Sequence, residues 1–361
     1  LLRSYLGVLG VPLGFEPARA ASIKLTYDTR AKPAQRYASF EQAVNAVEAL
    51  PGVEAAGIAD FLPLGRNRSW GPLVPKGHMY SPGEARSAPL VYVITPEFFR
   101  AMGIGMVAGR DFTWDDGPTH AREVIINEGL AKALWPGGNA VGQSVGQNPD
   151  LKVVGVVADV RETGIEGAPG WQAYYPAGQN GPDDARLVIR SRLPASTLAP
   201  SVMAALRQLN PEQAAASLVP IQQIVDHATS PRRFFLEFVL AFGGFGLLLA
   251  GLGLYGVISY AVTRRQQEIG VRMALGASAA RVRAMILRES LALALAGIGL
   301  GLAGALALGG LLSALLFDVS PADPLTFAAT AVVLAAAALL AAHLPARRAA
   351  RIEPMAALRG D

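Results

Sequence analysis

The chain has 361 residues, a formal net charge of +4 and a mean hydropathy of +0.32, and 52% of its residues are hydrophobic. It contains no cysteine, which excludes a disulfide framework and any metal or redox centre built on cysteine. The apolar residues are concentrated in residues 234–361, whereas residues 1–233 are a mixed polar and apolar region, long enough for one large or two small domains.

The chain begins with an apolar stretch, Leu1–Gly14, that contains Arg3. A helix needs about 20 apolar residues to cross a bilayer core about 30 Å thick, so this stretch is too short to span a membrane by itself. We interpret residues 1–20 as the end of a membrane helix that begins upstream, followed by a linker. A cleaved signal peptide is the alternative.

Residues 21–61 predict a β-α-β unit. A strand with alternating apolar residues covers Ala21–Asp28, and a second strand covers Val53–Phe61. Between them Ser39 is a candidate helix N-cap, and Gln42 would complete a capping box. The helix ends before Pro51 and carries its apolar residues on one face, namely Phe40, Ala43, Val44, Val47 and Leu50.

A second β-α-β unit is predicted downstream, with strands at Ala185–Ser191 and Ala215–Pro220 around a helix at Ser196–Leu209. Residues 62–184 lie between the two units and are rich in Gly and Pro. The elements predicted there are strands at Glu123–Ile126 and Leu151–Val160 and a helix at Glu128–Trp135. The fold class expected for residues 21–233 is therefore α+β, with a split β-α-β part (21–61 and 185–228) that carries an inserted subdomain (62–184).

Three long stretches of the C-terminal region contain no Asp, Glu, Lys or Arg, at residues 238–263, 290–317 and 324–346. Each is long enough to cross a bilayer, and a helix satisfies its own backbone hydrogen bonds in lipid. We therefore predict an all-α membrane domain of three transmembrane helices over residues 234–361. A short helix at Gln222–Ala228 and the polar segment Ser230–Arg233 would lead into it.

The charges that flank these spans predict their orientation. Residues 264–289, between the first two spans, contain six arginines and two glutamates, and the C-terminal tail contains four more arginines. The loop 318–323 has two acids and no base. The positive-inside rule places the arginine-rich loop and the tail in the cytoplasm and residues 1–233 outside. Because topology accounts for these arginines, nucleic-acid binding is not predicted.

Motifs typical of enzymes occur here in settings that do not fit enzymes. Gly142–Gly146 matches the G-x-S-x-G elbow of hydrolases, but Ser144 follows a loop instead of a buried strand, so we predict a Gly-rich turn and no catalytic residue. Two G-x-G-x-x-G patterns, at residues 251–256 and 299–304, lie inside predicted spans. No P-loop motif occurs in residues 1–361, and no cofactor is expected in this chain.

The glycines of the second span are better explained by helix packing. Gly297, Gly301, Ala305 and Gly309 repeat every four residues and predict a seam of small residues that lets another helix approach closely.

Neither ion transport nor metal binding is predicted. The interiors of the spans contain no carboxylate, lysine or arginine, which disfavours a proton relay or an ion path. The four histidines are isolated from one another, and none has a partner at metal-ligand spacing; they are His78, His120, His227 and His343.

The loop between the first two spans carries the most specific pattern. Gly276 would stop a short helix, and Ser278 would cap a helix at Ala279–Glu289 that continues into the second span. A solvated, arginine-rich turn is one interpretation. The other is a docking helix that presents an apolar and charged surface to a cytoplasmic partner. Its residues are Arg265, Glu268, Ile269, Gly270, Arg272, Leu275, Gly276 and Ala277.

This loop resembles the R-x-x-E-I-G-I-R-x-A-L-G-A pattern of the MacB/FtsX-like permeases of ABC transporters, which Arg265–Ala277 matches closely. Pro345–Arg359 resembles the family's C-terminal pattern P-A-R-R-A-x-R-I-x-P-x-x-A-L-R. Other similar segments are Thr95–Phe99, Gly109–Phe112, Ile126–Glu128, Leu134–Pro136, Val153–Val157 and Val319–Pro324. The resemblance extends over essentially the whole chain and is closest to the second half of the duplicated permeases that occur without a fused ATPase.

The resemblance implies an inner-membrane permease subunit with a periplasmic core domain, made of a porter-like and an inserted part, followed by an FtsX-like domain. It implies that a separate cytoplasmic ATPase docks on Arg265–Ala277, so ATP hydrolysis is expected in the partner and not in this chain. Other expected partners are the lipid bilayer and a second permease half or a second copy, and a periplasmic adaptor is a further candidate. The expected function is export or mechanotransmission. The alternatives are an FtsX-like regulator of a periplasmic enzyme and a membrane-tethered binding domain without an ATPase.

Overall fold

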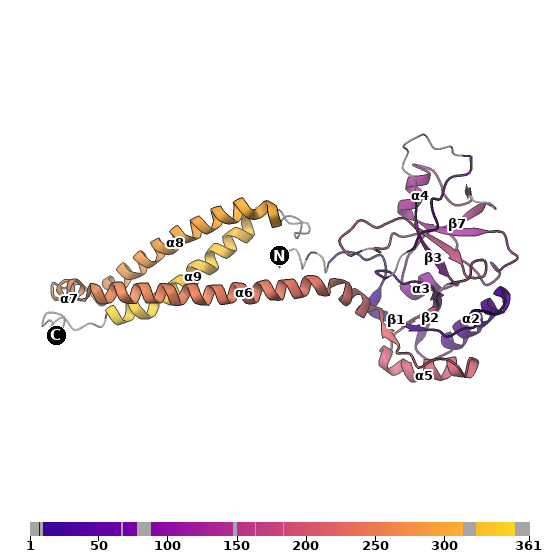
Figure 1. The fold of residues 1–361 in the computed structure, drawn as a ribbon, viewed down its shortest axis with the longest axis horizontal. Coiled ribbons are helices and arrows are strands. Elements are labelled where there is room, and N and C mark those ends of the chain that lie inside the picture. The colour runs from indigo at the N-terminus through magenta and orange to yellow at the C-terminus, as the bar shows by residue number, and fades with distance from the viewer. Residues whose placement is uncertain are drawn as a thin grey trace. The chain divides into compact units, whose positions relative to one another are not determined.

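A computed structural model describes residues 7, 10–65, 68–77, 88–146, 150–162, 164–182, 184–312 and 323–350 of the chain (Figure 1). The chain forms two compact units. One consists of Gly10–Pro231 and is called the sheet unit below; the other consists of Leu1–Leu9 and Arg232–Asp361 and is called the helical unit. This division agrees with the predicted fold class, an α+β domain followed by apolar helices, which is confirmed.

The described part of the sheet unit contains a ten-stranded mixed sheet with the strand order β10-β1-β9-β2-β3-β8-β5-β7-β4, and β6 pairs with β7. The strands are β1 (Ala20–Lys24), β2 (Val53–Ala59), β3 (Leu90–Ile94), β4 (Met106–Gly109), β5 (Glu123–Asn127), β6 (Ser144–Val145), β7 (Leu151–Val157), β8 (Gln172–Pro176), β9 (Arg186–Ser191) and β10 (Val219–Pro220). The helices are η1 (Pro17–Arg19), α2 (Pro33–Glu48), α3 (Phe98–Met102), α4 (Glu128–Leu134) and α5 (Ala195–Leu209).

The two predicted β-α-β units interleave. β1 and β2 both run antiparallel to β9, which lies between them, and β9 and β10 both run antiparallel to β1. Each unit is therefore split by a strand of the other, and one continuous four-strand group results. α2 and α5 cover the same face of this group, where Phe40 and Val44 share a core with Val202, Ile23 and Ile58.

The strands of residues 62–184 extend this sheet from the edge of β2. The backbone ladder at the join is short, because β2 and β3 share one residue pair, Ala59 with Ile94. Two side chains complete the join. The Asp60 carboxylate accepts from the Val93 amide at 2.9 Å, and the Thr95 hydroxyl accepts from the Ile58 amide at 2.8 Å.

Beyond this join a second core forms under α4, with Val124, Ile126, Leu130 and Tyr175 among its buried residues. At β2 a glycine permits close packing, since a Cβ on Gly57 would lie only 2.5 Å from the backbone of α3. The segments 62–184 and 185–228 thus belong to one compact unit, and whether 62–184 is a separate subdomain stays a prediction.

The start of the first helix was predicted wrongly. α2 begins at Pro33, and Ser39 lies inside it, where its hydroxyl donates to the Arg36 carbonyl at 2.7 Å. Proline has a fixed φ that suits the first helical turn, and an earlier start also buries Tyr37 on the face that contains Phe40. The capping box with Gln42 therefore does not form.

The helical unit contains α7 (Gln266–Ala274), α8 (Ala279–Leu312), α9 (Pro324–Ala349) and most of α6 (Ile221–Arg264). Three helical segments are long and apolar enough to cross a membrane, at Arg233–Arg264, Ala279–Ala307 and Pro324–Ala349. They include most of the predicted spans, although residues 313–317 lie outside the described residues.

The predicted short helix at Gln222–Ala228 is not separate. It is the beginning of α6, and Ser230–Arg233 is helical as well. A proline inside a helix costs about 3 kcal/mol, which is small against the packing and hydrogen bonds of a helix of this length. α6 accordingly continues through Pro231, over 44 residues in all.

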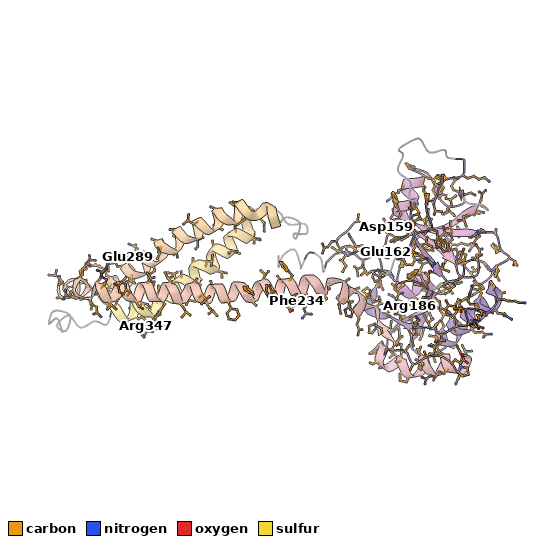
Figure 2. All side chains as sticks on the ribbon, in the orientation of Figure 1. Asp159, Glu162, Arg186, Phe234, Glu289 and Arg347 are labelled. Carbon is orange, nitrogen blue, oxygen red and sulfur yellow. The ribbon has the colours of Figure 1, made fainter. Side chains whose placement is uncertain are left out.

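A buried carboxyl group lies in the sheet unit, where Figure 2 labels Glu162. Glu162 is 3% exposed and accepts hydrogen bonds from the Tyr92 hydroxyl and from Gln172 Nε2, the latter at 3.2 Å. The Tyr92 ring stacks on Tyr174 with 5.2 Å between ring centroids, and no cation lies among these contacts. Burial raises the pKa of Glu162 to about 8.

This pKa predicts a pH-dependent stability. Between pH 4.5 and about 8 the folded protein keeps a proton that the unfolded chain releases, so stability falls as pH rises through this window. The slope from this group is at most about 1.4 kcal/mol per pH unit. All four tryptophans lie at or before residue 171, so fluorescence melting of the full chain in detergent reports on the sheet unit. We expect Glu162→Gln to flatten the decline, and Glu212→Gln, at an exposed position, to leave it unchanged. If the stability of wild type and of Glu162→Gln fell equally as pH rises, the pH dependence would not come from Glu162.

Candidate docking site at the α7 end of the helical unit

α7 is a short helix with defined ends. α6 ends at Arg264, and Arg265 leaves helical geometry before α7 begins. At the other end Gly276, with φ of +94°, donates to the Met273 carbonyl, and the Ala277 amide donates to the Arg272 carbonyl, both at 3.0 Å. These two bonds form a Schellman motif, which requires a left-handed residue and so favours glycine at position 276. The predicted helix stop at Gly276 is confirmed.

The helix that follows begins as predicted. Ser278 precedes α8, and its hydroxyl accepts from the Arg281 amide at 3.4 Å. Because α8 continues without interruption from Ala279 to Leu312, the segment next to the Schellman turn and the second apolar segment are one helix.

One face of α7 is buried in a small apolar core. Ile269 is 2% exposed, and Gly270 is buried as well. Ile269 shares this core with Ile258 of α6, with Ile286 of α8 and with Ala346 of α9. Figure 1 shows these helices converging where α7 lies. α7 is therefore held against the ends of all three long helices.

The opposite face of α7 is exposed. Glu268, Val271, Arg272 and Leu275 follow one another at i, i+3, i+4 and i+7, which places them on one side of a helix. Leu275 is 83% exposed, and Arg272 donates to Glu268 at 2.6 Å. This outward stripe combines two apolar side chains with one ion pair.

Polar contacts between side chains link α7 and its neighbours. Arg265 forms an ion pair with Glu289 of α8 at 3.2 Å, and Figure 2 labels Glu289 on the part of α8 near α7. Arg348 of α9 donates to the Tyr255 hydroxyl of α6 at 2.8 Å. A pocket of about 400 Å³ lies between α7 and α8, and Arg272, Arg281 and Arg288 contribute to its lining. The lining is therefore rich in positive charge, which suits an acidic partner surface.

The structure divides the predicted docking residues into two groups. Glu268, Arg272 and Leu275 are exposed, whereas Ile269 and Gly270 face the core of their own chain and are not available to a partner. Arg265, Gly276 and Ala277 fix the ends of α7. Ile269 and Gly270 are thus buried in this chain, and whether Arg265–Ala277 docks a partner stays a prediction.

One residue of the exposed stripe was missed. Val271 is 42% exposed, and the same i, i+3, i+4, i+7 spacing in the sequence identifies it once Glu268 and Leu275 are taken as one face.

The small-residue seam lies against an open cavity. Gly297, Gly301 and Ala305 line a cavity of about 560 Å³ between α6, α8 and α9. A Cβ added to Gly297 or Gly301 would meet no atom within 4 Å. Nothing in the described part of the chain packs tightly on the seam. The packing role of the seam, which includes Gly309, therefore stays a prediction.

The enzyme-like motifs lie in two helices and in a strand, whereas a Gly-rich turn was predicted around Ser144. Both G-x-G-x-x-G patterns lie within continuous helices, α6 and α8, and not at a strand-to-helix turn. Ser144 lies in the two-residue strand β6, which pairs with β7, the next described element of the chain. Neither geometry matches the corresponding catalytic or nucleotide site.

Two family models match the chain. Residues 17–221 match the MacB-like periplasmic core domain, and residues 240–354 match the FtsX-like permease C-terminal domain. The first match alone covers more than half of the chain. The chain belongs to the MacB/FtsX-like permease family. It is accordingly a membrane protein whose sheet unit is an extracytoplasmic domain.

Several relatives of this permease are known. The macrolide export ATP-binding/permease protein MacB 1/2 of Paracoccus denitrificans is 26% identical over 381 residues, which cover 99% of this chain and 56% of that protein. The probable syringafactin export ATP-binding/permease protein SyfD of Pseudomonas syringae pv. tomato is 27% identical over 285 residues, covering 74% of this chain and 42% of that protein. The chain therefore spans about half the length of the curated relatives it matches.

Among solved structures, the periplasmic region of MacB from Actinobacillus actinomycetemcomitans aligns with a TM-score of 0.40 at 16% identity. The alignment covers 61% of this permease and 97% of that structure.

The buried and exposed faces of α7 predict different effects of truncation. Ile269→Ala removes a buried side chain where four helices meet, a type of change that costs about 2–5 kcal/mol. Val271→Ala, on the exposed stripe, should change stability by less than about 0.5 kcal/mol. Trypsin digestion of the full chain in detergent measures the difference, because loosening of α7 speeds cleavage after Arg265 and Arg272. Equal cleavage rates in the two variants would contradict the buried position of Ile269.

Proposed function

We propose that this chain is an inner-membrane permease subunit that couples a cytoplasmic ATPase to motions of its periplasmic domain, for export or mechanotransmission. The observation that carries the proposal is the exposed stripe of α7, which is supported from behind by a core shared with all three long helices. A surface that is to transmit force must be attached to what it moves. Ile269 supplies that attachment, and Glu268, Val271, Arg272 and Leu275 supply the contact.

A displacement of α7 has a short route to the spans. The Schellman turn at Gly276 joins α7 directly to α8, and α8 is one helix as far as Leu312. The Arg265–Glu289 ion pair links the start of α7 to the same helix. A partner that pushes on the stripe would therefore move α7 and α8 together.

The nature of the partner follows from the surface and from the relatives. The relatives' names describe ATP-binding/permease proteins, and the family works with an ATPase. In the proposed arrangement a separate ATPase subunit inserts an apolar side chain beside Leu275 and places acidic residues near Arg272 and Arg281. ATP hydrolysis belongs to that partner. The chain would pair with a second permease half or a second copy, and a periplasmic adaptor is a further candidate partner.

Cysteine labelling tests the orientation on which this proposal depends. The chain has no cysteine, so Leu275→Cys and Leu209→Cys each introduce a single thiol at an exposed leucine, one on α7 and one in the sheet unit. We expect a membrane-impermeant maleimide to label position 209 in intact spheroplasts. Position 275 should be labelled only after the inner membrane is opened. Labelling of both positions from the same side would overturn the topology.

Co-purification with a candidate ABC ATPase tests the docking surface. Glu268→Arg combined with Leu275→Asp should reduce the ATPase recovered with the full chain at least about tenfold, which corresponds to about 1.4 kcal/mol. Leu209→Asp is the matched control, since it places the same charge at an exposed leucine of the sheet unit. If the double variant recovered as much ATPase as wild type, α7 would not be the docking site.

ATPase activity of the same purified complex distinguishes transport from regulation. Stimulation of the ATPase by a transported substrate is expected of an exporter. Stimulation by a periplasmic enzyme, without any response to a substrate, would favour the FtsX-like regulator instead.

A further inference from the structure

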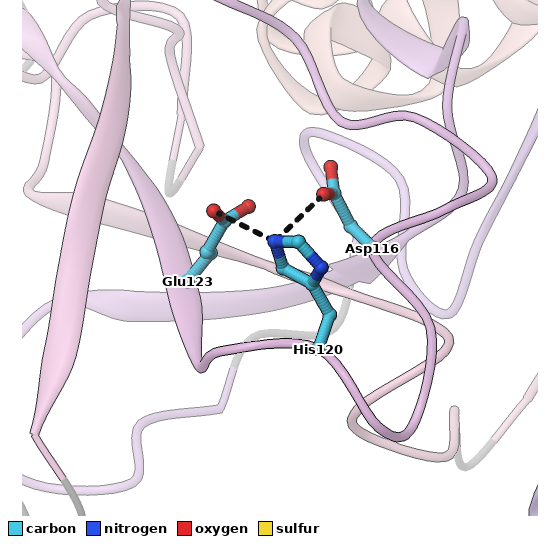
Figure 3. A group of neighbouring side chains, drawn as sticks. All are labelled: Asp116, His120 and Glu123. Atoms are coloured by element: carbon cyan, nitrogen blue, oxygen red, sulfur yellow. Dashed lines mark ion pairs between the residues drawn. The ribbon is translucent and has the colours of Figure 1, made fainter.

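The loop between β4 and β5 brings together three side chains that lie within eight residues of the sequence (Figure 3). Asp116 and His120 lie in this loop, and Glu123 is the first residue of β5. His120 was expected to have no partner at metal-ligand spacing, and the structure corrects this expectation. One imidazole nitrogen and one oxygen from each carboxylate lie within 4.8 Å of one another.

The spacing of these atoms suits a metal ion better than it suits hydrogen bonds. His120 Nε2 lies 3.7 Å from Asp116 Oδ1 and 3.6 Å from Glu123 Oε1. Hydrogen bonds between such atoms are shorter, at about 2.7–3.2 Å. Ligands of tetrahedral zinc, with bonds of about 2.0–2.2 Å, are separated by roughly 3.4 Å. His120 Nε2 is therefore within a few tenths of an ångström of this separation from each of the two carboxylate oxygens, and all three atoms lie within 4.8 Å of one another.

Arg110 holds both carboxylates from another side. Its guanidinium lies 2.7 Å from Asp116 Oδ2, 3.2 Å from Asp116 Oδ1, and 2.9 and 2.8 Å from the two oxygens of Glu123. The Thr113 amide also donates to Asp116 Oδ2 at 2.8 Å. Asp116 Oδ1 and Glu123 Oε1, the oxygens that face His120, each accept one hydrogen bond from Arg110. A carboxylate oxygen can accept about two hydrogen bonds. Each therefore keeps capacity for one more bond.

Charge and access also favour a cation. One arginine and two carboxylates leave one negative charge in excess when His120 is neutral. Asp116 and Glu123 are 2% and 5% exposed, so this charge is largely removed from water. The His120 side chain is 43% exposed, which leaves a route from solvent to the site. An ion bound there would connect the loop to the start of β5.

We propose that Asp116, His120 and Glu123 form a Zn²⁺ site of the extracytoplasmic domain, with Arg110 orienting the two carboxylates and water in the remaining position. An imidazole with two carboxylates suits Zn²⁺, whereas Ca²⁺ prefers oxygen ligands alone. The site is independent of the proposed docking of an ATPase, since it lies in the sheet unit.

Calorimetric titration of the purified full chain with Zn²⁺ tests the site. We expect one ion per chain in wild type and at least about tenfold weaker binding in His120→Ala, because loss of outer partners alone costs that much in metal sites. His227→Ala is the matched control, since His227 is also exposed and has no carboxylate grouped with it among the described residues. It should bind like wild type.

A second variant, Glu123→Gln, and a second measurement, the melting temperature, test the Zn²⁺ site independently of the titration of His120→Ala. Glu123→Gln retains an acceptor for Arg110 and should weaken Zn²⁺ binding as well. Zn²⁺ should raise the tryptophan-fluorescence melting temperature in wild type and His227→Ala, and have little effect in His120→Ala and Glu123→Gln. The proposal is overturned if wild type takes up no Zn²⁺ above a detergent blank, or if His120→Ala binds as tightly as wild type. Tight Ca²⁺ binding that is unchanged in His120→Ala would also overturn the Zn²⁺ proposal, because it would indicate a site made of oxygen ligands alone.

Discussion

A small apolar core holds the α7 end of the helical unit together, and the proposed coupling depends on it. Ile269 lies in this core with residues from the ends of α6, α8 and α9, while the side of α7 that carries Leu275 remains in solvent. Burial of an aliphatic side chain is worth about 1.5–3 kcal/mol, more than an exposed ion pair contributes. The surface polar contacts, such as Arg265 with Glu289, therefore adjust the position of α7 and do not by themselves retain it.

Much of this site was predictable from sequence, because local chemistry determines it. The Schellman turn needs a left-handed backbone at Gly276, Ser278 precedes a helix, and the arginines predict which side of the membrane is cytoplasmic. The sequence could not show which side of α7 is buried. Ile269 and Leu275 are both aliphatic, and only contacts with the distant residues Ile258 and Ala346 distinguish them. His120 differs, because Asp116 and Glu123 lie only four and three residues away, and the path of the loop brings their oxygens to its imidazole.

The sheet unit shows a similar contrast. The two β-α-β units were predicted because each has a clear alternation of strand and helix patterns, and β2, β9 and α5 fall close to their expected positions. β3, β4, β8 and α3 were not predicted, since they lie in a Gly- and Pro-rich region, and their pairing partners are remote in sequence. Several motifs shared with the family prove to be structural in this region. Asn127 caps α4 and also donates to Asp159 at 2.6 Å, and Arg110 joins two buried carboxylates.

The junction of β2 and β3 has a further consequence. Elsewhere in the sheet neighbouring strands are joined by backbone groups, which every amino acid possesses and which no single replacement other than proline removes. Here the Asp60 carboxylate and the Thr95 hydroxyl stand in for part of that ladder. A single substitution at Asp60 or Thr95 therefore removes a cross-strand bond that side-chain replacement at a purely backbone-paired position leaves in place, while the backbone bonds from Asp60 to Val93 and from Thr95 to Ile58 remain.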